Sequence, residues 1–251
     1  MPSVVTSAIV LHAFNYSESS RILRLATREA GVQTVMARGA RASQRRFGSA
    51  VDLFAEGEVQ FEVRPGRDMH TLARFDVLRS RTALGGSLER FEGASALAEV
   101  MLRVAGDDDT PSDAFDALQA GLDAIASDEA PTVATIAATW RLLSSLGFTP
   151  ALDSCVQCDT GMASTATVSF NAELGGVLCP TCAVRAPARR LPAEARGLIG
   201  RWLRGSSGGE AMAEPLDTPS VRAHQRLLRI FVHAHLTEGR PLRAFDAWAG
   251  G

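Results

Sequence analysis

Two pairs of cysteines constrain what this chain can fold into more than any other feature of its sequence. Cys155 and Cys158 form the first pair and Cys179 and Cys182 the second, with 20 residues between the pairs. A two-residue gap lets both sulfurs of a pair face one metal ion, and the loop between the pairs brings the second pair opposite the first. We therefore predict one zinc ion held by four thiolates. Two disulfides in a secreted protein and four free buried thiols are the alternative interpretations.

The predicted zinc ion is structural, not catalytic. Four thiolates fill a tetrahedral coordination sphere, so no position is left for water or a substrate. No histidine lies between 155 and 182 to act as an exchangeable ligand. The ion is expected to hold together a 28-residue segment that has few apolar core residues of its own.

Length and composition indicate an ordinary folded protein. The chain has 251 residues, of which 46% are hydrophobic and 22% are charged, so one large or two small globular domains are expected. No apolar run approaches the roughly 18 residues that span a bilayer. The first residues carry no basic region ahead of a hydrophobic stretch. We expect a soluble cytoplasmic protein that does not enter a membrane.

The charges are unevenly distributed along the chain. All 26 basic residues are arginine, a pattern typical of a GC-rich genome, and arginine is a planar donor suited to phosphate and carboxylate. Residues 1–81 hold 12 Arg and 8 acids, residues 82–185 hold 4 Arg and 14 acids, and residues 186–251 hold 10 Arg and 6 acids. Basic ends around an acidic middle predict that the ends contact a polyanion.

The fold class predicted is α+β, with a β domain over residues 1–81. Five apolar or alternating stretches, separated by glycine and proline turns, predict a small barrel. They are Val4–His12, Arg21–Thr27, Gln33–Arg38, Glu58–Arg64 and Thr71–Leu78. Five strands fit an OB-fold barrel, but periodicity alone does not separate it from an SH3-like barrel.

A helical bundle is predicted over residues 82–251. Apolar residues at helical spacing predict five helices, near residues 88–105, 115–125, 131–146, 192–204 and 218–235. The zinc module, at about 150–186, is inserted between the third and fourth of these helices.

Arginines of the β domain are the candidate DNA-binding residues. Residues 38–48 place four arginines on a glycine-bounded loop between strands, where OB-fold barrels bind single strands through phosphate contacts and base stacking. Phe14, Tyr16 and Phe47 are candidate stacking faces, and Arg28 adds to the basic surface. A charged, merely solvated loop is the alternative. The predicted DNA-binding residues are Arg21, Arg24, Arg38, Arg41, Arg45, Arg46, Phe47, Arg64, Arg67 and Arg74.

A second basic group lies on the last predicted helix. Arg222, Arg226 and Arg229 are four and three residues apart and so share one helix face, where they would bind phosphate or an acidic peptide tail unless the face is simply solvated. No GxSxG, phosphate-binding glycine loop or HExxH motif is present, so we expect no enzymatic activity. The competing functions are a zinc-ribbon transcription regulator that reads a specific duplex site, and a nuclease.

Several motifs together resemble the RecO family of bacterial recombination mediators, which act in DNA repair through the RecF pathway. The resemblance covers almost the whole chain, and the residues that carry it are 16–23, 25–31, 37–41, 46–48, 146–155, 170 and 175–180. The most specific is the Gly-x-x-Pro-x-Leu-x-x-Cys sequence that leads into Cys155, combined with the spacing of the cysteines.

The resemblance implies an N-terminal OB-fold, a helical domain and a zinc module with four cysteine ligands. It implies binding of single- and double-stranded DNA, annealing of complementary strands, and association with the nucleoid when bound to DNA. The implied protein partners are RecR and the acidic C-terminal tail of single-stranded-DNA-binding protein (SSB), with RecF and RecA as indirect partners. With RecR, such proteins help to load RecA onto coated strands.

Overall fold

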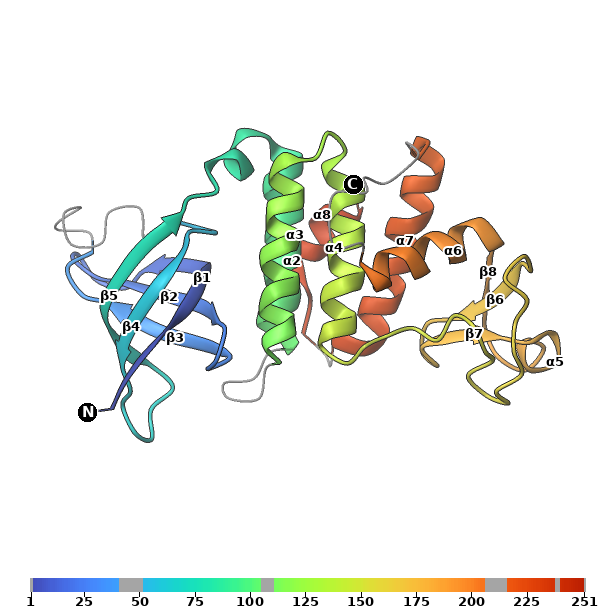
Figure 1. Ribbon diagram of the computed structural model, residues 1–251, viewed down its shortest axis with the longest axis horizontal. Helices are drawn as coiled ribbons and strands as arrows, with labels where there is room; N and C mark the ends of the chain where they lie inside the picture. The colour runs from blue at the N-terminus through green and yellow to red at the C-terminus, as the bar shows by residue number, and fades with distance from the viewer. Residues whose placement is uncertain (1, 41–51, 105–110, 206–215, 238–239, 251) are drawn as a thin grey trace.

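The chain forms an elongated molecule with three parts in a row (Figure 1). The computed structural model describes residues 2–40, 52–104, 111–205, 216–237 and 240–250. A β-barrel lies at one end, a group of helices occupies the middle, and the cysteine-containing module lies at the other end (Figure 1).

The N-terminal part is the predicted five-stranded barrel. Its strands are β1 (Ser3–Asn15), β2 (Arg21–Thr27), β3 (Val32–Ala37), β4 (Glu56–Glu62) and β5 (His70–Arg79). They pair in the order β1-β2-β3-β5-β4, and β4 pairs with β1 to close the barrel. Only the β3–β5 pair is parallel. Closure removes the free sheet edges that would otherwise pair with other chains.

Alternation along β1 divides its side chains between two cores. Ala8 and Val10 belong to the cluster inside the barrel, whereas Ile9 and Leu11 belong to the cluster formed with the helices. The register of the β1–β2 ladder shifts between Val10 and His12, as expected of a β-bulge. At Ile9 and Leu11 the outer face of β1 is therefore buried against the helical part.

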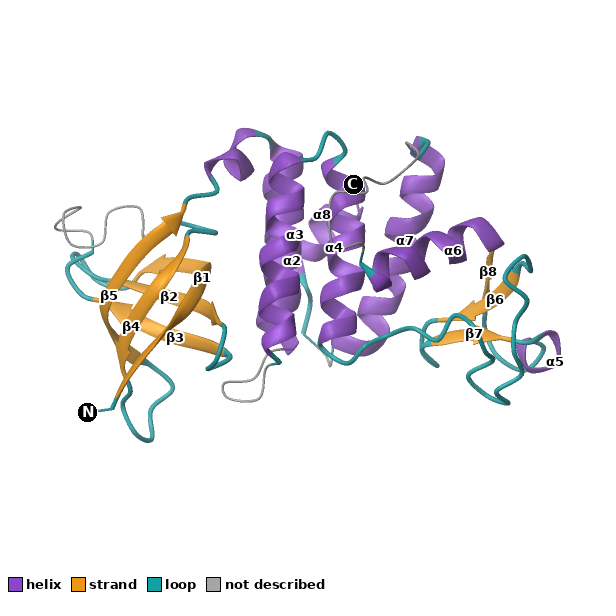
Figure 2. Cartoon of the chain, viewed as in Figure 1, coloured by secondary structure: helices purple, strands orange, loops and turns teal. Residues whose placement is uncertain are grey.

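The helices fill the middle of the molecule (Figure 2). After a short 3-10 turn, η2 (Thr82–Gly86), come α2 (Leu88–Val104), α3 (Ser112–Ser127), α4 (Pro131–Ser145), α6 (Ala193–Arg204), α7 (Thr218–Leu236) and α8 (Arg243–Gly250). The five predicted helices are confirmed, and α8 is an addition that the sequence did not indicate. No helix in the described part of the chain has the length and apolar character needed to cross a bilayer.

Close packing of α2, α3 and α4 depends on a small residue. A Cβ atom at Gly121 would lie 2.8 Å from both Leu97 and Ala138, which is closer than real side chains allow. Pro131 starts α4 at a position where its missing N–H costs no hydrogen bond. Trp140 of α4 is fully buried and its ring lies 5.0 Å from that of Phe231.

Ion pairs between the barrel and α3 fix how the barrel sits on the helices. The Arg81 side chain is 2% exposed; its Nε donates to Asp123 at 2.7 Å and its guanidinium also pairs with Glu56. Arg79 pairs with Asp123 as well, and Arg28 pairs with Asp116 of α3 at 2.5 Å. The pairs at Arg79 and Arg81 thus form one network through Asp123, and Arg28 with Asp116 forms a second contact between the barrel and α3.

The cysteine module contains a small antiparallel sheet. Its strands are β6 (Val168–Asn171), β7 (Gly176–Leu178) and β8 (Arg189–Leu191), in the order β7-β6-β8, with the single helical turn α5 (Pro180–Ala183) after β7. The module lies between α4 and α6 in the chain, as predicted. Its strands were not predicted, because three or four residues are too few to show a periodicity.

Candidate metal centre and nucleic-acid interface

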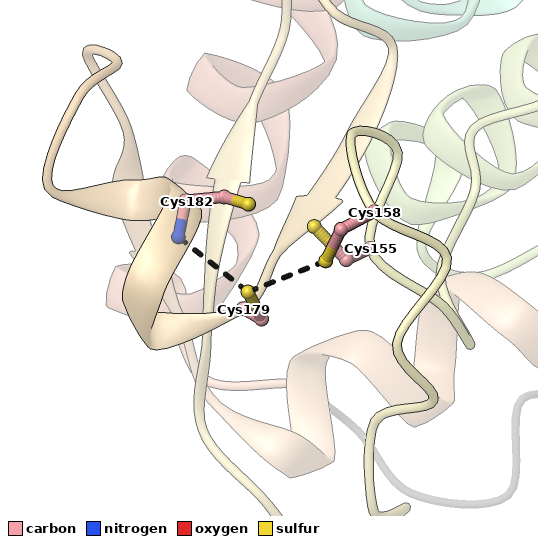
Figure 3. Close-up of side chains that lie close together, drawn as sticks. All are labelled: Cys155, Cys158, Cys179 and Cys182. Atoms are coloured by element: carbon pink, nitrogen blue, oxygen red, sulfur yellow. Dashed lines mark hydrogen bonds between the residues drawn. The ribbon is translucent and has the colours of Figure 1, made fainter.

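The four cysteines converge at one point of the module (Figure 3). Their sulfur atoms all lie within 4.8 Å of one another, and the Cys158 and Cys179 sulfurs are 3.7 Å apart. None of the four forms a disulfide. A tetrahedral ion with metal–sulfur bonds of about 2.3 Å separates its ligands by about 3.8 Å, so the observed spacing fits one ion.

Local backbone structure positions each pair of sulfurs. The first pair occupies a tight turn in which the Cys155 N–H donates to the Thr160 carbonyl at 2.9 Å and the Asp159 N–H donates to the Cys155 carbonyl at 2.8 Å. Cys179 caps α5, and its sulfur accepts the backbone N–H of Cys182 at 3.5 Å. Figure 3 shows the turn and α5 presenting their sulfurs to a common centre.

The surroundings of the thiols favour unequal ionisation. The backbone N–H of Cys179, with further N–H donors from the turn, lowers the pKa of Cys155 to about 6. The Thr160 hydroxyl lowers the pKa of Cys158. Cys182 would be the last to ionise, because its hydrogen bond to Cys179 and the neighbouring sulfurs raise its pKa to about 12. Thiolates this close repel one another, and a divalent cation would relieve that repulsion.

The donor set fits a soft or borderline metal ion in a closed site. Four sulfur ligands occupy every position of a tetrahedral sphere, which is the pattern of structural sites. Cys155 and Cys179 are buried, whereas Cys158 is exposed. The predicted ligand set is therefore brought together as a group that can hold one metal ion.

Three of the predicted DNA-binding arginines lie on the β2–β3 side of the barrel. Arg21 and Arg24 are half-buried on β2, and Arg38 is exposed just after β3. Arg21 pairs with Ala37 in the β2–β3 ladder, which places it beside the end of β3 that leads to Arg38. Its Nε donates to the Asn15 side chain at 3.2 Å. Arg24 is three positions further along β2, so alternation places its side chain on the opposite face from Arg21.

Three others lie along β4 and β5. Arg64 and Arg67 belong to the turn that joins these strands, where Arg67 is exposed. They line a shallow pocket with Phe61 and with His70, which stacks on the Phe61 ring at 5.6 Å. Arg74 lies further along β5 and is paired with Asp76 at 2.6 Å. The remaining predicted DNA-binding residues lie outside the described residues: Arg41, Arg45, Arg46 and Phe47.

Other arginines of the barrel are held by the helices instead. Arg28, which the sequence placed on the basic surface, pairs with Asp116 and lies over the Phe115 ring at 4.8 Å. Arg79 and Arg81 pair with Asp123. No sequence pattern indicates these partners, because acid and base are far apart in the chain.

The arginines predicted to bind a partner lie on α7, as expected. Arg222 and Arg226 are exposed. Arg229 is part of a cluster that the sequence did not reveal, in which its Nε donates to Asp246 of α8 at 3.0 Å and His233 contacts the same carboxylate at 2.6 Å. A pocket of about 340 Å³ lies beside Arg226, with Leu191, Leu227 and Ile230 among its apolar walls.

Comparison with known proteins identifies the family. The models described as "Recombination protein O N terminal" and "Recombination protein O C terminal" match residues 1–81 and 86–244. The chain belongs to the recombination protein O (RecO) family. The RecO match at the N-terminus covers the barrel, which is the family's OB-fold domain, so the OB-fold prediction is confirmed over the SH3-like alternative.

Similar RecO proteins cover nearly the whole chain. The DNA repair protein RecO of Anaeromyxobacter sp. (strain K) is 37% identical over 97% of this chain and 95% of its own length. Those of Nocardioides sp. (strain ATCC BAA-499 / JS614) and Myxococcus xanthus (strain DK1622) are 30% and 31% identical, over 95% and 96% of this chain and 96% and 95% of their own lengths. RecO membership gives the chain a role in DNA repair and recombination.

Proposed function

We propose that this RecO-family protein is a recombination mediator with no enzymatic activity. It binds single- and double-stranded DNA, anneals complementary strands, and helps to load a recombinase onto DNA coated with SSB. Its place of action is the cytoplasm, at the nucleoid when DNA is bound. The observation that carries this proposal is the exposed arginine surface on an OB-fold barrel within a DNA repair family.

Phosphate contacts supply the affinity in this proposal. Arg38 and Arg67 are exposed, and within the described residues neither forms an ion pair. Their guanidinium groups would neutralise backbone phosphates and release counterions, so binding should weaken steeply as salt increases. Exposed Phe14 and Tyr16 on or beside β1 offer stacking faces that accept any base.

Annealing requires no bond to be made or broken in the protein. Two strands repel each other through their phosphates, and arginines that neutralise those phosphates lower the repulsion. The pairing edges of the bases remain free, because the protein holds the strand by its backbone. A nuclease would instead need acidic ligands around an open metal site.

Zinc is the ion that we assign to the cysteine cluster. Bound zinc would neutralise the thiolates held by the turn at Cys155 and by α5, and would join those two segments. The role is structural, since the four sulfurs leave no position for a reacting group.

The α7 surface is the proposed docking site for the acidic C-terminal tail of SSB. Exposed Arg222 and Arg226 would attract carboxylates, and the pocket beside Arg226 would accept apolar side chains of the tail. Arg229 is proposed with them, although its guanidinium also pairs with Asp246. RecR is proposed as a direct partner, and RecF and RecA as indirect ones.

The test measures binding and annealing with barrel variants. Fluorescence anisotropy of a labelled homopyrimidine strand and of a random duplex gives affinities over a range of salt. The change Arg38→Ala with Arg67→Ala should weaken binding to both and lower the salt slope on the single strand by about 1.4, the value for two lost phosphate contacts. Changing Arg41, Arg45 and Arg46 to Glu should do the same more strongly, and annealing should slow in parallel.

Arg185→Ala is the matched control, because Arg185 is exposed in the cysteine module at the far end of the molecule. It should leave affinity and salt slope unchanged. Unaltered binding in both sets of barrel variants would refute the barrel assignment. Binding confined to one duplex sequence would favour the transcription regulator, and cleavage of labelled DNA with magnesium would favour a nuclease.

A further inference from the structure

A large groove lies where the barrel meets the helices. Its volume is about 1050 Å³, and its walls come from β1, β2, the residues before β4, α2 and the start of α8. We call it the junction groove. The side chains that matter here are Arg24, Arg103, Arg240, Arg243, Phe91 and Leu53.

The junction groove is positively charged. Among the described residues that line it, four are arginines and one, Glu99, is an acid whose carboxylate accepts the backbone N–H of Phe245 at 2.9 Å. Arg240 and Arg243 are exposed, and no ion pair within the described residues involves them. A groove lined by one sign of charge concentrates the opposite charge.

Arg103 builds this groove and adds to its charge. Its guanidinium donates to the carbonyl oxygens of Arg240 and Pro241 at 2.9 and 3.1 Å, so it fixes the segment that leads into α8. These acceptors are neutral, and none of the ion pairs between described residues involves Arg103. Arg103, a third cation, therefore holds the segment with Arg240 and Arg243 against α2.

One wall of the groove is aromatic and apolar. Phe91 is 40% exposed and Leu53 is 36% exposed. Phe91 packs edge-on against Phe54, with ring centroids 6.2 Å apart. Phe54 is buried, so the exposed Phe91 ring rests against a packed side chain.

The outer face of β1 continues into the wall of the junction groove at His12. His12 lies directly opposite Arg24 in the β1–β2 ladder, so both side chains are on the same face. The His12 ring also lies 5.5 Å from the ring of Phe14, which is 42% exposed. A row of flat rings beside an arginine therefore runs along the outer face of β1 to the junction groove.

We propose that the junction groove binds a single strand of nucleic acid that continues from the barrel. Arginines would contact its phosphates and Phe91 would stack on an unpaired base, the combination that single-strand sites use. This inference rests on the proposed function and extends it to a second binding segment, contributed by α2 and the C-terminal region. Paired DNA has no free base face for Phe91, so the aromatic wall favours a single strand over a duplex.

The test compares short and long strands on one double variant. Oligothymidylates of about 8 and about 30 nucleotides are chosen so that the short strand fits an OB-fold barrel alone and the long one also reaches the groove. Arg240→Ala with Arg243→Ala should bind the short strand like the wild type. It should bind the long strand about tenfold more weakly, with a salt slope lower by about 1.4.

A second variant reports on the groove locally. The chain's three tryptophans, Trp140, Trp202 and Trp248, are all buried, so the fluorescence added by Phe91→Trp comes from the groove. Stacking should quench that added signal with the long single strand. The matched control is Arg201→Ala with Arg204→Ala, which removes two exposed arginines from α6, outside the groove.

The outcomes separate this inference from the proposed function. A wild-type protein that binds neither strand would refute the proposed function. Wild-type binding of both strands, with equal affinity and salt slope in the groove variant, would refute only the groove. Equal quenching of Phe91→Trp by a duplex of the same length would also overturn the inference, because unpaired bases would then not be its ligand.

Discussion

Replacing Arg81 with methionine would test whether the barrel is held on the helices by a buried ion-pair network. Arg81 is 2% exposed, donates to Asp123 at 2.7 Å and to the Phe54 carbonyl at 3.0 Å, and pairs with Glu56. Methionine keeps the length of the side chain and removes the charge. The side chain of Glu56 is 11% exposed. Among its interactions with described residues, it would keep only the hydrogen bond that its carboxylate accepts from Gln119.

The expected loss is several kcal/mol. Removing one partner of a buried ion pair costs about 3–5 kcal/mol, since the other charge stays buried without compensation. Asp123 is 36% exposed, so water can solvate its carboxylate once Arg81 is replaced. The expected loss therefore lies at the lower end of this range. We therefore expect the free energy of unfolding to fall by about 3 kcal/mol. Urea unfolding followed by circular dichroism and by tryptophan fluorescence gives this quantity.

A surface ion pair provides the control. Arg74 pairs with Asp76 at 2.6 Å, but the two side chains are 70% and 44% exposed, so Arg74→Met should leave the free energy of unfolding nearly unchanged. Arg81→Met combined with Glu56→Met should recover part of the loss, because no charge is then stranded. If Arg81→Met costs no more than Arg74→Met, the network does not hold the barrel in place.

Two further perturbations concern the helices and the metal centre. Burial lowers the pKa of His224 to about 4. Below pH 6.5 the His224 imidazole therefore binds a proton in the unfolded chain but not in the folded chain. Stability should therefore fall by roughly 2 kcal/mol between pH 6.5 and 5 relative to the His224→Leu variant, measured by urea unfolding at each pH; parallel curves would contradict this. Cys179→Ser should reduce bound zinc well below one ion per chain and lower the melting temperature, while DNA affinity stays near the wild-type value; loss of affinity in a variant that is still folded at the assay temperature would mean that the module contacts DNA.

Elements with local signals could be predicted from the sequence, and those that depend on distant partners could not. The predicted span of β2, Arg21–Thr27, agrees with the structure, and Pro131 begins α4 as expected. The short helix α8 was missed, because two turns do not establish a periodicity and much of its burial comes from α2. With α8 missing, the partner of Arg229 was missing too.

The two candidate sites differ in the same way. The cysteine cluster was predictable, because the spacing within each pair fixes two ligands locally and the chemistry requires the pairs to meet. The arginines of the barrel all look alike in the sequence. Only the fold separates exposed Arg38 and Arg67 from Arg28, Arg79 and Arg81, which α3 neutralises.

Three polar residues of α3 set the angle at which the barrel sits on the helices. Asp116, Gln119 and Asp123 follow one another at three- and four-residue steps, so they project from one side of the helix toward Arg28, Glu56 and Arg81. One residue added within α3 ahead of Asp116 would turn that side by about 100°. The same rotation would carry Leu118, Gly121 and Leu122 away from α2 and α4, so the packing of the bundle and the orientation of the barrel on it would be lost together.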